Sequence, residues 1–519
     1  MSCKIQFYGR DFSNIDLDLN KTREEGFDFE LTNTYRHNIL LYFLNHIKNS
    51  IEPLIVNTKN NNVGSESREL FSEIDDDKYF FGGTVGVVSK TLNMYRSDIK
   101  GELVQDEENN EYKVEVSLQI QSRFDVNPDK TIGKPFFLST MLSGSKPILN
   151  NDFIPSNTED YLFDYLLLFL FKAKLEEANV KGLYRTYHRF ERNDDRVKGT
   201  IDVSRHIKEN MGLNNGRIAY SYRENSTNNY LNHLIVTAYN YLKKRYFGMV
   251  NGLFDNSHPE LKRLIDNLSM SIGYPKYDTK TIIMKNLNSI SHPFYTEYEA
   301  LRKICLRILR NEGVSIFDGI SLEKVEGILF YIPDLWEKYL ESFLRDSQYN
   351  FSPQWRIQLI DYNNDSVFRQ ATYPDYVFFN DRNFKEPFMI LDAKFKEKWS
   401  EIVLNKGAIS SVLEDYDKCV RDMVSINSHA TGVVFPTNNV RAMQPTEYIK
   451  HSISEYNSLA KFYTFPIFVP YSSDNYRAWL KDFRTNCQEI SKMIKDCVAK
   501  EKNFMLTSRT LVAQLEALR

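Results

Sequence analysis

The sequence predicts a multi-domain α/β protein, and three observations support this fold class. The chain has 519 residues, which is more than a single hydrophobic core usually serves. Hydrophobic residues make up 42% of the chain and aromatic residues 14%, enough to fill several cores. Segments with the two-residue period of strands and segments with the helical period both occur, and they are unevenly distributed along the chain.

Residues 1–150 are expected to form a β-rich α/β domain. Helical periodicity predicts a helix over residues 34–50, and the composition of residues 80–90 predicts a strand. In residues 111–124 apolar and polar side chains alternate, which predicts a half-buried strand with one face in water. The polar segment 57–75 is predicted to be a loop.

Residues 151–330 are expected to form a mostly helical middle domain. The apolar segment near Tyr161 predicts a buried helix that begins near Thr158 and ends near Gly182. Its apolar run is interrupted by Asp164 and is too short to span a bilayer. Further helices are predicted over residues 228–245, 258–268 and 295–310, with a polar, Gly/Asn-rich stretch at 196–229.

Residues 331–519 predict an αβββαβ unit followed by a helical tail. An amphipathic helix at residues 334–346 precedes three segments with the composition of strands. The predicted strands are 355–360, 373–380 and 387–395, followed by a helix at 412–426, buried strands at 431–436 and 465–470, and a final helix from about 475.

Charge, cysteine content and missing motifs narrow the function classes. The net charge of −3 gives no overall basic signal for nucleic acid, although a local cleft can be basic in an acidic protein. Five cysteines without a C-x-x-C pair indicate a reduced, cytoplasmic protein without disulfides or a zinc site. We expect no signal peptide, no membrane association and, without a G-x-x-x-x-G-K-[ST] loop, no bound nucleotide.

The strongest indication of a site is the segment PDYVFFNDRNFKEPFMILDAKFK, residues 374–396. A turn is predicted near residues 381–383, so the two strands would fold back on each other and bring Asp375 towards Asp392. Alternate residues share a strand face, so Asp392 and Lys394 project on the same side. Buried charges are costly unless they are paired or bound, so these three side chains indicate a site.

Oxygen ligands are what Mg²⁺ prefers, usually one or two carboxylates together with substrate phosphate. The candidate ligands are Asp375, Asp392 and the backbone carbonyl of Ala393. A metal there would polarise a phosphoryl oxygen and activate water, and Lys394 could orient that water or stabilise charge on the phosphate. Because D-x-K also occurs elsewhere in the chain, a solvent-facing ion pair at a strand end is the open alternative.

The segments YPDYVFF and PFMILDAKF resemble the PD-(D/E)XK nuclease superfamily, with Asp375, Asp392 and Lys394 as its signature. LWEKYLESFL is similar to the LFExY helix of the McrC subunits of McrBC-type restriction systems. This resemblance implies that Glu337 is an additional metal ligand or an orienting acid. A solvated helix face is the alternative for Glu337.

Other segments are also similar to McrC-like proteins, and the similarity is sharpest from Leu335 to Pro436. These segments are GGTVGVVS, SLQIQSRFD with PFFLSTML, GLYRTYHRFERNDDRVKGTIDVSRHI and ENSTNNYLNHLI. The chain departs from the family at Lys418, where many members carry Gln, and this form resembles the LlaJI-like branch. Lys418 and Arg421 could contact phosphate, or they could be surface charges paired with acids at helical spacing.

The resemblance implies an Mg²⁺-dependent endonuclease subunit that cleaves double-stranded DNA in a GTP-dependent, anti-phage restriction system. Its partner would be a separate McrB-like AAA+ GTPase, and residues 1–150 would dock on that partner and stimulate GTP hydrolysis. The PD-(D/E)XK domain would then be residues 331–519. Two alternatives stay open: an autonomous repair or recombination nuclease of the same superfamily, and a non-catalytic subunit that only activates a GTPase.

Overall fold

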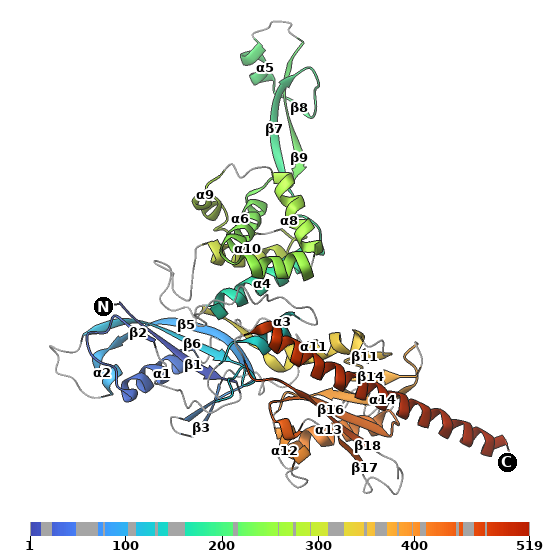
Figure 1. The fold of residues 1–519 in the computed structure, drawn as a ribbon. Helices are drawn as coiled ribbons and strands as arrows, with labels where there is room; N and C mark the ends of the chain where they lie inside the picture. Colours follow the sequence, from blue (N-terminus) through green and yellow to red (C-terminus); the bar gives the residue numbers. More distant parts are fainter. Residues whose placement is uncertain are drawn as a thin grey trace, which may run out of the picture. The chain divides into compact units, whose positions relative to one another are not determined.

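The protein is described here by a computed structural model (Figure 1). It describes residues 2–11, 23–47, 71–75, 78–101, 110–129, 133–143, 161–210, 216–257, 259–272, 277–290, 292–309, 326–346, 350–358, 371–380, 383–396, 398–404, 412–442, 446–449, 461–472 and 475–517. Its contacts divide the chain into unit 1, Met1–Asn151 with Gly319–Arg519, and unit 2, Asp152–Asp318. The expected regions 1–150 and 331–519 therefore both fall in unit 1. The mixed α/β class is confirmed.

Five strands form the first sheet of unit 1, in the order β10–β5–β6–β1–β2. The strands are β1 (Ser2–Arg10), β2 (Arg23–Glu25), β5 (Thr84–Tyr95), β6 (Glu111–Gln121) and β10 (Glu326–Tyr331). Along the first half of β6 buried residues alternate with exposed ones, as the sequence predicts. Helix α1 (Asn33–Ile47) packs Ile39, Leu40 and Phe43 into the same core as Val114 and Val116.

Two predictions for this part of the chain are corrected. Residues 57–75 are predicted to be a loop, but Phe71–Asp75 form β3, which pairs with β4 (Lys78–Phe81), and residues 57–70 lie outside the described residues. The sequence analysis places residues 326–330 in the mostly helical region 151–330, yet Glu326–Tyr331 form β10 and pair with β5. β-branched and aromatic residues in this segment favour a strand. The helical segments before and after it in the sequence make this strand pattern hard to recognise. Two short helices, α2 (Arg96–Lys100) and α3 (Phe136–Ser143), complete this part of unit 1.

Six strands form the second sheet of unit 1, in the order β11–β14–β15–β16–β18–β17. The strands are β11 (Phe351–Pro353), β14 (Tyr376–Phe379), β15 (Pro387–Ala393), β16 (Ala430–Thr437), β17 (Thr446–Ile449) and β18 (Lys461–Phe468). β14 and β15 form the predicted antiparallel hairpin, and β15, β16 and β18 are parallel. All eight residues of β16 are buried, as expected for a parallel strand covered on both faces.

One strand of the predicted αβββαβ unit is wrong. The sequence places the first strand at residues 355–360, but β11 occupies that place beside β14. Of the predicted segment, Ile357–Gln358 form β12 and pair with β13 (Ala371–Thr372) in a separate two-stranded sheet. Residues 355–356 are not in a strand, and residues 359–360 lie outside the described residues, so the prediction holds only for Ile357–Gln358 and not for their partner.

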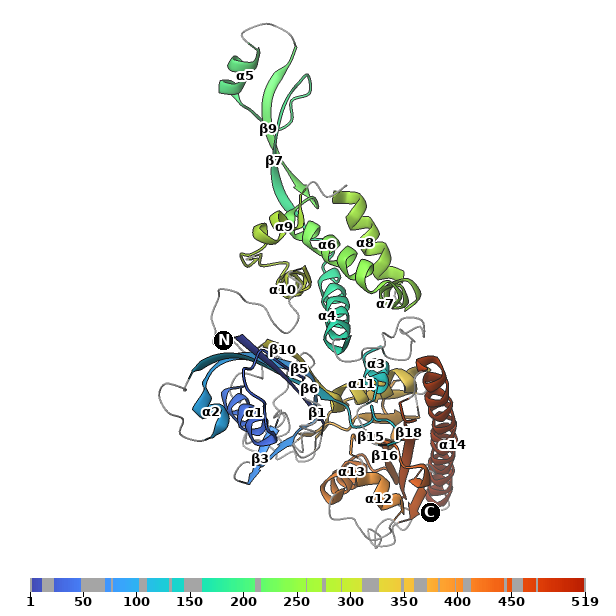
Figure 2. The same cartoon turned by 60° about the vertical axis from the view of Figure 1, so that its left-hand side comes forward.

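Helices cover both faces of the second sheet (Figure 2). They are α11 (Ile332–Asp346), α12 (Lys398–Leu404), α13 (Leu413–Ser425) and α14 (Tyr476–Ala517). Consecutive residues of β18 point to opposite faces: Phe462 packs against Trp399 of α12 and Tyr416 of α13, whereas Tyr463 donates a hydrogen bond to Glu501 of α14. Helices α12 and α13 therefore lie on one face and α14 on the other.

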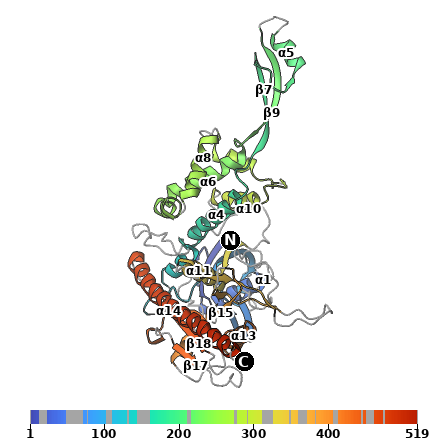
Figure 3. The ribbon, with the colours of Figure 1, turned by 90° about the vertical axis from the view of Figure 1, so that its right-hand side faces the viewer.

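Unit 2 contains the predicted helices and a β-ribbon that the sequence analysis missed (Figure 3). Its helices are α4 (Tyr161–Asn179), α5 (Val203–Asn210), α6 (Tyr230–Arg245), α7 (Phe247–Val250), α8 (Pro259–Ile272), α9 (Thr279–Lys285) and α10 (Glu297–Leu309), with a π-helix at Asn251–Ser257. β7 (Thr186–Asp194) pairs with β9 (Ile218–Ser226), and β8 (Thr200–Ile201) pairs with the other edge of β9. The ribbon buries little of either face, so its hydrophobic pattern is weak. Among the described helices none is both long and apolar enough to cross a membrane.

Candidate functional site

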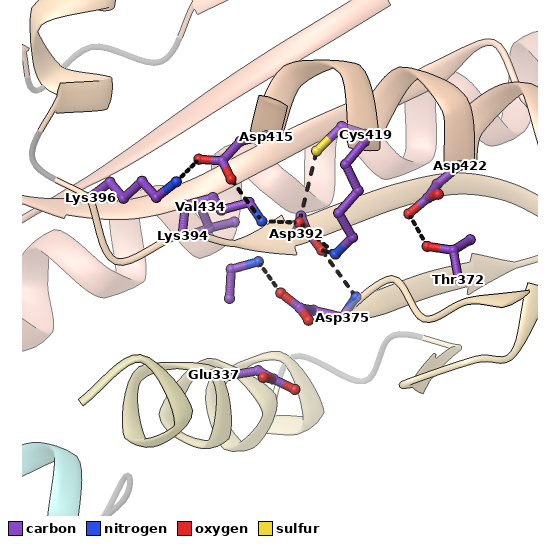
Figure 4. A network of polar contacts seen from close by, with 12 residues as sticks. Glu337, Thr372, Asp375, Asp392, Lys394, Lys396, Asp415, Cys419, Asp422 and Val434 are labelled. Carbon is purple, nitrogen blue, oxygen red and sulfur yellow. Dashed lines mark hydrogen bonds and ion pairs between the residues drawn. The ribbon is translucent and has the colours of Figure 1, made fainter. Parts of the chain in front are cut away.

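The β14–β15 hairpin brings Asp375 and Asp392 together (Figure 4). Tyr376 pairs with Leu391, and the next step of the same register places Asp375 opposite Asp392. The backbone N–H of Asp375 donates to Oδ1 of Asp392 at 3.2 Å. The N–H of Ala393 donates to Oδ2 of Asp375 at 2.7 Å. Since the N–H and C=O of a strand residue point to the same side, the Ala393 carbonyl lies on the same side of β15 as its N–H.

Two lysines neutralise Asp392. Lys394 Nζ lies 2.5 Å from Oδ2 of Asp392, which confirms that the two side chains share a strand face. Lys418 of α13 lies 3.3 Å from both carboxylate oxygens of Asp392. Asp392 is only 1% exposed, so the alternative of a solvent-facing ion pair is wrong.

Glu337 reaches this cluster through Gln354. The Nε2 of Gln354 donates to Oε1 of Glu337 at 2.7 Å and to Oδ1 of Asp375 at 3.1 Å. Gln354 has φ of 51°, in the left-handed region, and its own N–H donates to the carbonyl of Asp375. Tyr376 also donates through its hydroxyl to the backbone carbonyl of Glu337. Helix α11 is therefore fixed directly against the hairpin.

The second predicted phosphate contact, Arg421, pairs with Asp422 of its own helix. Arg421 Nε lies 3.5 Å from Asp422, and the Arg421 side chain is 49% exposed. Asp422 also accepts a hydrogen bond from Thr372 at 3.1 Å. The structure thus brings Asp375, Asp392, Lys394 and Lys418 together and leaves Arg421 on the outer side of α13.

Sequence reasoning missed three residues of this cluster. Asp415 lies 3.6 Å from Lys394 Nζ and 2.9 Å from Lys396 Nζ, and the Cys419 thiol lies 3.9 Å from Asp392. Residues 415, 418, 419 and 422 have the spacing of one helix face, so periodicity could have indicated that this face meets β15. Gln354 had no such signal, because its role depends on a backbone conformation that glutamine rarely adopts.

The two acids have opposite pKa shifts. Burial and the nearby charges of Asp392 and Glu337 raise the pKa of Asp375 well above its usual range. Burial alone would also raise the pKa of Asp392, but Lys394 and Lys418 hold it below its usual value. Burial would lower the pKa of Lys394, but the attraction of Asp392, Asp375 and Asp415 raises it well above its usual range. Lys394 is therefore an ammonium at neutral pH.

The donor chemistry of this cluster suits a hard cation. Carboxylates of Asp375 and Asp392 and the Ala393 carbonyl offer oxygen ligands at the end of the hairpin. Within the described ranges no three Asp, Glu, His or Cys side chains gather closely enough to hold a metal by themselves. A cation here would therefore complete its coordination with water or substrate oxygens, as Mg²⁺ commonly does.

Comparison with protein families identifies the chain. The family model of the McrBC 5-methylcytosine restriction system component matches residues 110–412, more than half of the sequence. The chain belongs to the McrBC family. The McrBC match includes Glu337 and the entire β14–β15 hairpin and ends just before α13, the helix that carries Lys418.

Two solved structures from Thermococcus gammatolerans are similar to this McrBC family member. The first is a refined half-complex from a tetradecameric assembly of McrB AAA+ hexamers with bound McrC; it has 13% identity and a TM-score of 0.45 and covers 93% of this chain and 100% of that chain. The second is the McrBC complex, with 12% identity and a TM-score of 0.28, covering 66% of this chain and 88% of that chain. A search of curated proteins found no match.

Proposed function

We propose that this chain is the nuclease subunit of its restriction system and that residues 331–519 form a PD-(D/E)XK endonuclease domain. It would cleave phosphodiester bonds of double-stranded DNA with Mg²⁺. The observation that supports this best is the buried cluster at the end of the hairpin, where Asp375, Asp392 and Lys394 meet. Two acids in contact carry a charge repulsion that a bound cation would relieve, consistent with the raised pKa of Asp375.

Each residue of the cluster has a distinct proposed role. Asp375, Asp392 and the Ala393 carbonyl would hold Mg²⁺, and Glu337 would assist through its link to Asp375 across Gln354. When bound, the ion supplies Lewis acidity to a phosphoryl oxygen and lowers the pKa of water.

The cations of the cluster face the anionic substrate. Lys394 carries a proton at neutral pH and can donate to the attacking water or to the phosphate as its charge develops. Lys418 is held on Asp392 but its side chain is 31% exposed, so it can also reach a phosphate. Arg421, more exposed on the same helix, would contact the DNA backbone further from the reacting bond.

The proposed partner is an McrB-like AAA+ GTPase, with which this cytoplasmic subunit would form a hetero-oligomer. Membership of the McrBC family supports a restriction role, and this chain has no phosphate-binding loop of its own. Residues 1–150 would dock on the partner and stimulate GTP hydrolysis. Dependence on the partner would restrict cleavage to DNA on which the GTPase acts.

The proposal is tested with purified full-length chain, Mg²⁺ and a long phage duplex, prepared with and without 5-methylcytosine. The product of the neighbouring AAA+ gene and GTP are added or omitted. Asp392→Ala is the test variant, and Asp417→Asn, an exposed acid on α13, is the matched control.

Three outcomes separate the candidate functions. Cleavage that requires partner and GTP, persists in Asp417→Asn and is lost in Asp392→Ala supports the restriction nuclease. Cleavage by the chain alone would support an autonomous nuclease. If no condition gives cleavage while Asp392→Ala still stimulates GTP hydrolysis, the chain is a non-catalytic subunit and the hairpin charges are structural.

A further inference from the structure

An aromatic cluster joins the two sheets of unit 1 directly beside the site. It contains Phe124 and Phe137 from the N-terminal part and Trp336 and Phe395 from the C-terminal part, each at most 4% exposed. The Phe395 ring lies 5.3 Å from Phe124 and 6.1 Å from Phe137, and Phe137 lies 6.1 Å from Trp336. Two of these aromatic residues adjoin candidate site residues in the chain: Phe395 follows Lys394, and Trp336 precedes Glu337.

Arg123 connects the first sheet to this cluster. Arg123 lies just after β6, and its backbone N–H donates to the carboxylate of Asp11, the residue after β1. Its Nη2 donates to the backbone carbonyl of Phe395 at 2.9 Å. The guanidinium also lies 5.0 Å from the Phe395 ring centroid and 5.2 Å from that of Phe124. One side chain therefore holds both the main chain and the ring of Phe395.

The position of Lys394 depends on the contacts that fix the next residue, Phe395. Strand β15 ends at Ala393, so Lys394 and Phe395 lie beyond the ladder of the hairpin. The N–H of Lys394 donates to the Val434 carbonyl at 2.9 Å, which also accepts from the Trp336 indole at 3.4 Å. On the other side of Lys394, the Arg123 contact restrains the next residue. A displacement of about 1 Å in a reacting group can lower a rate about a hundredfold.

The aromatic packing at this junction does not by itself require an arginine. The four buried rings stabilise the junction without any charged group, and a charge beside them loses hydration. A planar guanidinium can donate in its plane to a carbonyl while its face lies on an aromatic ring, whereas an ammonium cannot do both in one fixed geometry. Arg123 uses both modes on the same residue, which fits a role in orienting Phe395.

We propose that Arg123 is a positioning residue of the nuclease site. Through Phe395 it holds Lys394 against Asp392, so a residue beside the first sheet of unit 1 completes a site built around the β14–β15 hairpin of the second. This inference rests on the proposed nuclease function. It adds a second role for residues 1–150 beside the proposed docking, because Arg123 also restrains the residues that follow β15.

The test compares Arg123→Gln and Arg123→Lys with wild type in the full chain, with the AAA+ partner, GTP, Mg²⁺ and duplex DNA. The matched control is Arg345→Gln: Arg345 lies 5.4 Å from the Phe351 ring and pairs with Glu341 on the outside of α11. Cleavage kcat, KM for DNA, GTP hydrolysis and the midpoint of thermal unfolding are measured for each variant.

We expect Arg123→Gln to lower kcat about tenfold to a hundredfold, with KM and GTP hydrolysis within about twofold of wild type. Arg123→Lys should not restore kcat, because lysine keeps the positive charge but lacks the planar guanidinium that contacts both the carbonyl and the ring of Phe395. Arg345→Gln should match wild type in all four measurements. If Arg123→Gln does not fold, Arg123→Lys decides the question, since it keeps the aliphatic stem and the charge.

Two kinds of result would contradict the inference. An unchanged kcat in Arg123→Gln, or full recovery in Arg123→Lys, would show that Arg123 only fills space or supplies charge, and the inference would be wrong. If wild type does not cut, or if Asp392→Ala still cuts, the proposed nuclease function fails, and the positioning role fails with it. Loss confined to Arg123 variants, with wild type active and Asp392→Ala inactive, supports both.

Discussion

The second sheet of unit 1 carries a buried carboxylate cluster at each end of its parallel strands, and the two differ in what satisfies them. Where β15 ends, the backbone N–H of Asp375 donates to Asp392, and both Lys394 and Lys418 pair with Asp392. Where β18 begins, one buried acid, Glu501 of α14, accepts from His429 at 2.6 Å, Tyr463 at 2.6 Å and Lys461 at 3.0 Å.

The pKa values express this difference. Burial alone would raise the pKa of Glu501, but hydrogen bonds from His429, Tyr463 and Lys461 lower it to about 2. At the other end burial and the nearby charges of Asp392 and Glu337 raise the pKa of Asp375, while Lys394 and Lys418 pair with Asp392. A single acid with enough donors stabilises the fold. A second acid in contact with the first creates a charge that a ligand can satisfy, and this excess separates a candidate site from a structural cluster.

The largest expected effect comes from removing charge at the hairpin. Asp392→Asn keeps the size of the side chain but removes the partner of two lysines and a proposed metal ligand. Cleavage should fall by at least about a hundredfold, with GTP hydrolysis by the partner unchanged. Cleavage of plasmid or phage DNA followed on gels measures this, and a rate within about threefold of wild type would contradict the proposed role.

The corresponding substitution in the other cluster, Glu501→Gln, should lower stability and leave catalysis intact. It leaves Lys461 and its neighbours without a buried counter-charge, which we expect to lower the free energy of unfolding of this part of the protein by about 3 kcal/mol. Urea unfolding followed by tryptophan fluorescence measures it, since Trp399 and Trp336 are buried in the same unit. Normal stability combined with lost cleavage would reverse the assignment of the two clusters.

A smaller effect is expected from the bridge between Glu337 and Asp375. Gln354→Asn tolerates the left-handed backbone but is one methylene shorter, so it cannot reach both acids as glutamine does. Cleavage should fall about tenfold and require more Mg²⁺, because Glu337 would no longer be held near Asp375. A titration of the cleavage rate with Mg²⁺ measures this shift, and Gln358→Asn in β12 is a control of the same chemistry. An unchanged Mg²⁺ requirement would show that Glu337 acts independently of Gln354.

The contrast between the clusters also explains how much the sequence could predict. Asp375, Asp392 and Lys394 lie on one hairpin, so a turn and the two-residue period of strands were enough to bring them together. The side chains that complete the cluster come from elsewhere, and their contacts depend on tertiary packing. Lys418 was predicted to meet phosphate, but its contact with Asp392 required knowing which face of α13 meets β15.

The fold shows the same limit. Strands with one buried face, such as β6, and long amphipathic helices, such as α11, have local periodicity and were predicted. The β7–β9 ribbon has polar residues on both faces, and β10 joins a sheet far away in sequence, so neither left a clear local pattern. The role proposed for Arg123 in the site could not be predicted either, because its partner Phe395 lies 272 positions away in the sequence.

The smallest effect is the pH dependence of the structural cluster, and it follows from the direction of the Glu501 shift. Its folded-state pKa of about 2 lies below the usual value of 4.5, so Glu501 contributes its full stability above about pH 5 and loses that contribution as pH falls towards 2. The stability difference between wild type and Glu501→Gln should therefore be constant from pH 7 to pH 5. It should shrink by about 1.4 kcal/mol for each pH unit below about 4.5. Urea unfolding of both proteins at pH 7, 5, 4 and 3 measures this difference, and a difference that stays constant to pH 3 would mean that Glu501 is not ion-paired as the structure places it.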